Sequence, residues 1–215
     1  IPWVGLARAG RVQLRPFVPT LPWKNWRGVL DDAAALVVSH ALPTTGEILP
    51  LEEICDRAHR RDALVVASGS HAAGIVPVDV HELGVDAYVA SGSGLLLGPR
   101  GTALLYVRDT ILPRLVPASR RVDGLESATQ PQTAGIETAA ALELEERDPS
   151  RAAGLATSLD YLTALGLDVV REHAAILARY LFEGVHGMPG VELLSSEEAI
   201  TACPIVGLRV TKRPY

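Results

Sequence analysis

Short apolar runs alternate with polar and turn-rich segments along most of this 215-residue chain. Residues 63–68 and 87–91, which read ALVVAS and AYVAS, have the length and continuous apolar character of strands buried on both faces of a parallel sheet. Residues 12–18, 33–40 and 102–108 are predicted as further strands. The pattern therefore favours a sheet whose strands are mostly buried.

A helix is predicted between the strands at residues 33–40 and 63–68. Residues 50–62 begin with Pro50, which suits a first helical turn, and Glu52 and Glu53 follow at positions that complement the helix dipole. Parallel strands separated by helices are typical of a doubly wound or related three-layer α/β sheet.

The C-terminal third of the chain has helical periodicity. Residues 134–146 are predicted as one helix and residues 150–185 as a longer one that is interrupted near Gly166. Apolar residues recur at helical spacing in the longer segment: Leu155, Leu159, Leu162, Val169, Ile176, Leu177 and Leu181. Such a stripe indicates core or a subunit interface. Residues 187–194 and 203–210 then predict the beginning of a small α/β domain.

Composition and charge exclude several classes of function. A hydrophobic content of 48% and a charged content of 21% are typical of a globular protein, and a formal charge of −5 without a basic cluster argues against nucleic acid or an anionic membrane as partner. We expect a cytoplasmic protein, because the sequence shows neither a membrane span nor a signal peptide. Cys55 and Cys203 form neither a disulfide pattern nor a zinc pattern.

Residues 66–108 contain a long series of motif positions in fixed order. They read VASGSHAAGIVPVDVHELGVDAYVASGSGLLLGPRGTALLYVR. The framework positions are Gly69, His71, Gly74, Pro77, Asp79, Leu83, Gly84, Asp86, Ser91, Gly92, Leu96, Gly98, Pro99, Gly101, Leu105, Tyr106 and Arg108. In this series the chain resembles the class V aminotransferases, which are fold-type-I pyridoxal phosphate (PLP) enzymes that include the cysteine desulfurases and isopenicillin N epimerase-like proteins.

The resemblance carries expectations about architecture and assembly. It implies a fold-type-I PLP-transferase-like three-layer α/β sandwich with a mostly parallel sheet and the start of a small C-terminal α/β domain. Residues 1–150 would be part of the large domain, and residues 151–215 would be the long connecting helix and the beginning of the small one. It also implies a homodimer, or a heterodimer with a complete homologue.

The positions at which the family carries its cofactor chemistry hold other residues here. The Schiff-base lysine aligns with Gly94 and the histidine before it with Ser93, while the aspartate that pairs with the pyridine nitrogen aligns with Ser68. Glycine has no amine to form an imine, and a serine hydroxyl cannot hold a proton on the ring by charge. Pro43 replaces the residue near the phenolic oxygen and has neither a side-chain donor nor an N–H. The resemblance implies PLP as cofactor, but we expect none.

Some residues that could bind a ligand remain in the sequence. Ser91 and Ser93 lie in a Gly-rich turn whose hydroxyls and amides suit an anion, and Thr129 matches a family threonine that reaches the phosphate of the neighbouring subunit's cofactor. His71 is the best remaining acid or base, although it equally suits a structural role in its turn. The candidate ligand-binding residues are Ser68, Ser70, His71, Ser91, Ser93, Gly94 and Thr129, with His71 as the candidate catalytic residue.

Three functions stay open at this point. The favoured one is a PLP-independent member of the family that binds a small ligand or a partner subunit. The second is an enzyme that uses the vacant pocket for PLP-independent chemistry on an amino-acid-derived metabolite. The third is a PLP enzyme whose lysine comes from another chain, because Lys24 and Lys212 are the only lysines in the sequence and neither lies in the motif segment.

Overall fold

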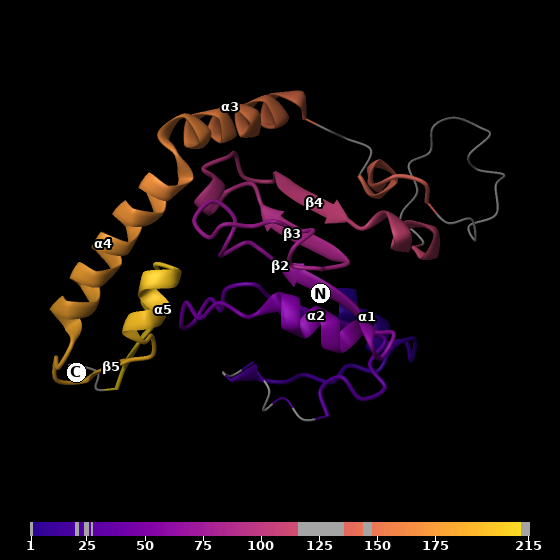
Figure 1. Cartoon of the computed structure of the whole chain (residues 1–215), viewed down its shortest axis with the longest axis horizontal. Coiled ribbons are helices and arrows are strands. Elements are labelled where there is room, and N and C mark those ends of the chain that lie inside the picture. Colours follow the sequence, from indigo (N-terminus) through magenta and orange to yellow (C-terminus); the bar gives the residue numbers. More distant parts are fainter. Residues whose placement is uncertain are drawn as a thin grey trace.

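The main sheet has four five-residue strands (Figure 1). The computed structural model describes residues 2–19, 22–23, 26, 28–115, 136–143 and 148–211. The strands are β1 (Ala35–Ser39), β2 (Leu64–Ser68), β3 (Ala87–Ser91) and β4 (Ala103–Val107), and they lie in the order β1-β2-β3-β4. The first three are parallel and β4 is antiparallel to β3. The predicted α/β fold with a mostly parallel sheet is therefore confirmed.

One face of the sheet is covered by α2 (Leu51–His59). Its buried residues Leu51, Ile54, Cys55 and Ala58 recur at the three- and four-residue spacing of a helix face. They join a core that includes the inward-facing side chains of the strands: Leu36, Val38, Val65, Ala67, Tyr88 and Ala90. Each large apolar side chain buried here contributes about 1.5–3 kcal/mol to the stability of the fold. The packing of α2 on the strands therefore holds the sheet in place.

The other face of the sheet is covered over part of its area. Two 3-10 segments, η3 (Asp109–Arg114) and η4 (Ala139–Leu142), pack over its end near Ala87 and Val107 together with Ile136. Towards the carboxyl ends of the parallel strands, Val37, Val89 and Leu105 are exposed by 48%, 38% and 43%. Parallel sheets are normally covered on both faces, so these three side chains form a bare apolar surface.

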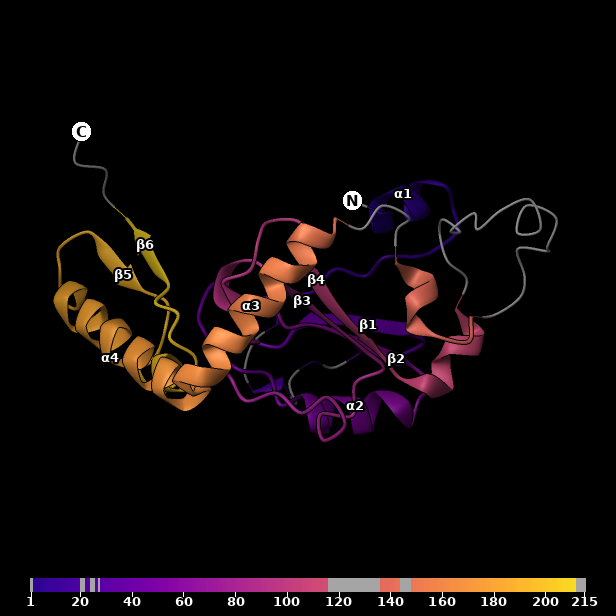
Figure 2. The same cartoon turned by 90° about the horizontal axis from the view of Figure 1, so that it is seen from above.

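A second group of elements follows the main sheet. It contains α3 (Pro149–Leu165), α4 (Leu167–Val185), β5 (Val191–Leu193), α5 (Glu197–Ala202) and β6 (Leu208–Val210), with β5 and β6 antiparallel. Figure 2 shows α4, β5 and β6 to one side of the main sheet, with α3 leading towards them.

Local sequence sets the helix boundaries of this group. Asp148 caps α3 by accepting a hydrogen bond from Ser150 N, and Pro149 occupies the first turn. Gly166, at φ 84°, ends α3 and begins α4, as the sequence predicts. A glycine suits this position because side chains are strained at positive φ. The division into two domains near residue 150 stays a prediction.

Two predicted elements differ in the structure. Residues 12–18 form no strand, and within 134–146 the described residues form only the short 3-10 segment η4. The first segment contains Pro16, which cannot donate to a ladder and confines such a run to a sheet edge at best. Among the described helices none combines the length and the apolar character required to cross a bilayer.

Asp86 lies buried directly before the first residue of β3. Its Oδ2 accepts from Val65 N at 2.7 Å and lies 2.8 Å from His59 Nε2, while Arg108 Nε is 3.6 Å from Oδ1. Arg108 also donates to the carbonyls of Gly84 and Val85. A single carboxylate therefore joins β2, α2 and the exit of β4.

Replacing Asp86 tests this role. Asp86→Ala leaves Val65 N–H and the Arg108 guanidinium without their buried acceptor, so we expect the free energy of unfolding to fall by about 3 kcal/mol. Urea denaturation of this variant, of Asp86→Asn and of the exposed Asp160→Ala measures the effect. Asp86→Asn, which keeps an acceptor, should lose less, and Asp160→Ala should stay within about 0.5 kcal/mol of wild type. A loss for Asp86→Ala no larger than that of Asp160→Ala contradicts the role.

Candidate functional site

Serine side chains gather where the three parallel strands end. Ser39, Ser68 and Ser91 are the last residues of β1, β2 and β3. Ser39 pairs with Ser68 in the register, and Ser68 pairs with Val89, two residues before Ser91. Because side chains alternate along a strand, all three serines point to the partly bare face of the sheet. They form a half-buried row of hydroxyls that borders its exposed apolar surface.

The turn after β2 places two more candidate residues. Ser68 Oγ donates to Ser70 Oγ at 3.4 Å, and Gly69 N donates to Val89 O at 2.7 Å. His71 is exposed, and among the described residues none is recorded as hydrogen-bonded to its imidazole. Its carbonyl accepts from the Cys203 thiol at 3.4 Å. The backbone of His71 is therefore held by a hydrogen bond, whereas its ring is exposed to solvent.

The turn after β3 brings Ser93 and Gly94 to the same edge. Ser91 Oγ and Ser93 Oγ lie 3.0 Å apart. Ser93 precedes the short 3-10 segment η2 (Gly94–Leu96). Gly94 is exposed at φ 80°, and a Cβ built on it would meet nothing within 4 Å. The position thus opens into free space beside the serine pair.

A buried histidine and tyrosine support the turn after β2. His40 Nδ1 lies 2.9 Å from Tyr88 Oη, and His40 N donates to Ser68 O at 2.8 Å. A Cβ on Gly69 would overlap the Tyr88 ring, so this position requires glycine. Burial lowers the pKa of His40 to about 4, below its ordinary value of 6.5, and raises the pKa of Tyr88 to about 12. Both groups are therefore neutral at physiological pH.

The structure brings together six of the seven ligand-binding candidates. The hydroxyls of Ser68 and Ser70 make one pair and those of Ser91 and Ser93 another, with Gly94 and His71 in the adjoining turns. Thr129 lies outside the described residues, as do Lys24 and Lys212. Ser39, which sequence reasoning missed, joins the set through its pairing with Ser68. Its place next to the last residue of the strand predicted at 33–40 was the available signal.

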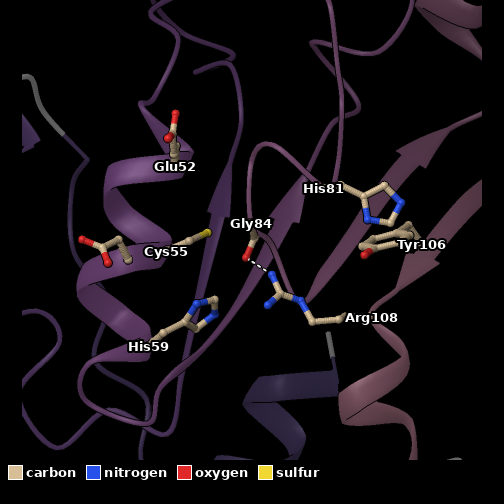
Figure 3. A pocket seen from close by; sticks show the side chains of 8 residues that line it. Glu52, Cys55, His59, His81, Gly84, Tyr106 and Arg108 are labelled. Carbon is tan, nitrogen blue, oxygen red and sulfur yellow. Dashed lines mark hydrogen bonds between the residues drawn. The ribbon is translucent and has the colours of Figure 1, made fainter.

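A separate cleft of about 490 Å³ lies at the opposite edge of the sheet (Figure 3). Its lining residues are Glu52, Cys55, Asp56, His59, His81, Gly84, Tyr106 and Arg108. His59 and Arg108 both bind Asp86, and burial, followed by the charge of Asp86, raises the pKa of the Cys55 thiol to about 12. No group of three metal-ligating side chains occurs in the described part of the chain. The cleft is therefore bordered by structural groups and an unreactive thiol.

The fold and the motif positions together define a class V aminotransferase-like protein. The family profile described as "Aminotransferase class-V" matches residues 1–212. The chain is 30% identical over 207 residues to "Probable cysteine desulfurase 2" of Mycobacterium leprae (strain TN), and 32% identical over 202 residues to a cysteine desulfurase of Enterobacter sp. (strain 638). This chain belongs to the class V aminotransferase family.

The chain spans about half the length of these relatives. The two matches cover 90% of this chain but 47% and 49% of the curated proteins. Among solved structures, the apo cysteine desulfurase from Thermococcus onnurineus NA1 superposes with a TM-score of 0.77 at 22% identity. That match covers 97% of this chain and 53% of the other. It establishes the likeness in fold.

His40 makes the stability of the fold depend on pH. Folded His40 stays neutral down to about pH 4, whereas unfolded His40 is protonated near 6.5, so the unfolded state binds more protons between these values. The contribution of neutral His40 to the free energy of unfolding should have its full value above pH 6.5. The free energy of unfolding should then fall by about 3 kcal/mol as the pH drops to about 4. Urea denaturation across this range measures the fall.

Two histidine variants identify the source of this pH dependence. In His40→Gln, the free energy of unfolding should decrease much less between pH 6.5 and pH 4, because glutamine does not titrate. In His186→Gln, at an exposed position, it should decrease as much as in wild type. An equal fall in His40→Gln and in wild type would assign the pH dependence to other groups.

Proposed function

We propose that this protein is a PLP-independent member of the class V aminotransferase family that binds a small anionic ligand at the carboxyl ends of its parallel strands. The observation that carries the proposal is the pairing of Ser91 with Ser93 beside the open position of Gly94. Ligands of α/β sheets bind outside the carboxyl ends of the strands, which is where these residues lie. The edge therefore offers hydroxyls to a ligand and no amine to a cofactor.

The residues at this edge do not fit PLP. A lysine-bound cofactor requires an amine at the position that Gly94 occupies, and a protonated pyridine nitrogen requires a carboxylate where Ser68 stands. Ser68 is engaged with the neutral hydroxyl of Ser70. Pro43, in the turn that follows β1, offers no donor. No step of PLP chemistry is supported by these side chains.

The same residues fit an anion such as phosphate or sulfate. Serine hydroxyls rotate freely and can both donate to one acceptor. The turn adds the backbone N–H groups of Ser93 and Gly94, whereas Gly92 N donates to Thr102 O at 2.9 Å. Ser91 and Ser93 are half-buried, so water competes for their hydroxyls only from one side. Hydrogen bonds to a charged acceptor are stronger than those to a neutral one, which favours an anion over a neutral ligand.

Binding is favoured here over catalysis. A general base needs a partner that orients its ring and a surrounding that tunes its proton affinity. The His71 imidazole is exposed and has no recorded hydrogen bond to a described residue. Among the described residues, therefore, none holds the best acid or base of the edge in a fixed orientation.

Spectroscopy tests the independence from PLP. The wild-type protein titrated with PLP should show no imine absorbance band and, after borohydride reduction, no covalent adduct. Gly94→Lys with Ser68→Asp should gain a reducible adduct at the new lysine, because a side chain at residue 94 would meet nothing within 4 Å. The positive φ of 80° there strains the lysine backbone, so circular dichroism first checks that the variant folds. The Ser68→Asp variant alone serves as the control and should gain none. An adduct on the wild type, located by peptide mapping, overturns the proposal.

Calorimetry with inorganic phosphate tests the anion site. The double variant Ser91→Ala/Ser93→Ala should bind phosphate roughly tenfold or more weakly than wild type, because two hydroxyl donors to a charged acceptor are lost. Thr110→Ala, an exposed position on η3, should bind as wild type does. Equal affinity of wild type and the double serine variant, or no binding by wild type, rejects this site.

A further inference from the structure

The segment between α5 and β6, residues 203–207, packs on the turns that follow β1 and β2. It shares with these turns one cluster of buried and partly buried apolar side chains. The buried members are Ala41, Ala72, Val76 and Cys203, and Ile48 and Ile205 pack on them. Cys203, which is 1% exposed, donates through its thiol to His71 O at 3.4 Å. The segment therefore lies on the carboxyl edge of the main sheet, and Figure 1 shows α5 beside the loops at this edge.

Two glycines allow the segment and the turn after β1 to meet closely. A Cβ on Gly207 would lie 1.8 Å from Thr44 O, which belongs to that turn. A Cβ on Gly46, in the same turn, would lie 2.9 Å from Ile205 O. Both neighbours are backbone atoms, which cannot turn aside as the end of a side chain can, so each position requires glycine. Ser195 Oγ fixes the segment by accepting from Gly207 N at 2.7 Å and donating to Ile205 O at 3.1 Å.

The turn after β2 joins this contact to the candidate anion site. The thiol of the segment binds the His71 carbonyl, one residue after the Ser70 hydroxyl of the site. A Cβ on Gly74, in the same turn, would lie 2.8 Å from Leu95 O, one residue after Gly94. Closing the segment onto the turn therefore fixes both groups of candidate ligand residues. A fixed site binds a ligand more tightly than a loose one, because less order has to be gained on binding.

We propose that residues 203–207 separate from the carboxyl edge while the main sheet stays folded, and that an anion bound at this edge keeps them closed. This coupling rests on the anion site of the proposed function. Separation is local, because the core between α2 and the sheet is formed by residues between Phe17 and Tyr106. A ligand that prefers the closed form shifts the population towards it. By linkage, closing the segment strengthens anion binding by the same factor.

Alkylation of the two cysteines with iodoacetamide measures the separation. Cys203 lies in the contact and Cys55 in the core of the main sheet, and burial raises the pKa of these thiols to about 11 and about 12. Because the thiolate is the reactive form, each cysteine reacts when its own surroundings open. In the wild type without ligand, mass spectrometry of peptides should show Cys203 reacting roughly tenfold or more faster than Cys55. Equal rates, which mean that the segment opens only with the whole fold, overturn the proposal.

Inorganic phosphate tests the coupling. At constant ionic strength, saturating phosphate should slow the alkylation of Cys203 in the wild type about threefold or more. It should have no such effect in Ser91→Ala/Ser93→Ala, which lacks the hydroxyls of the proposed site. Phosphate that binds in calorimetry without slowing the reaction overturns the coupling and leaves the proposed function intact. Phosphate that does not bind to the wild type overturns both.

A clash at the contact provides the complementary test. Gly207→Ala places a methyl group against Thr44 O, so Cys203 should react roughly a hundredfold or more faster. Phosphate should then bind about threefold or more weakly, because the closed form no longer predominates. Gly184→Ala, on α4, where a Cβ meets nothing within 4 Å, is the matched control and should behave as the wild type does.

A second variant loosens the contact without a clash. Ile205→Ala removes apolar contact with the cluster and should change both quantities in the same direction as Gly207→Ala, to a smaller extent. Circular dichroism confirms that each variant is folded. If Gly207→Ala and Ile205→Ala both react and bind as Gly184→Ala does, the proposal is wrong.

Discussion

The buried carboxylate of Asp86 is the constraint on which the main sheet depends. Removing a carboxylate from water is costly, and the cost is offset only if each of its oxygens finds a donor. Val65, His59 and Arg108 supply these donors from three different elements. The start of β2, the end of α2 and the exit of β4 are therefore fixed relative to one another at the amino edge of the parallel strands.

This anchor also determines where the candidate site lies. Each strand has five residues, so the carboxyl edge is about 13 Å from the amino edge. There the neutral pair of His40 and Tyr88 holds the turn after β2 against β3, and Gly69 permits the close approach of the Tyr88 ring. The serine row therefore stands on a rigid base, which suits a binding site better than a mobile loop does.

Sequence reasoning identified what depends on local pattern and missed what depends on distant partners. Residues 63–68 and 87–91 were predictable as strands because continuous apolar runs of that length suit buried strands. The role of Asp86 was not predictable in this way, because its local sequence resembles a turn and its partner His59 lies 27 residues away in sequence. The break at Gly166 was predictable because glycine is favoured at positive φ.

The same distinction applies to the helical stripe and to the serines. Leu155 and Leu162 of the predicted stripe are buried, whereas Val169 and Ile176 of the same stripe are exposed. Periodicity shows which residues share a face but not what covers that face. Ser68 and Ser91 were found from motif positions, whereas Ser39 lies outside those motifs and was placed beside Ser68 by the strand register.

The bare part of the sheet and the serine row share one surface, so the proposed anion binding and the covering of the sheet are linked. Val89 pairs with Ser68 and stands two residues before Ser91 on the same face. Any element that packed on Val89 and Leu105 would also shield the adjoining hydroxyls from water. A shielded hydroxyl binds an anion more strongly, because the hydrogen bond forms in a medium of lower dielectric constant. By linkage, an anion bound there would strengthen the packing of that element by the same factor.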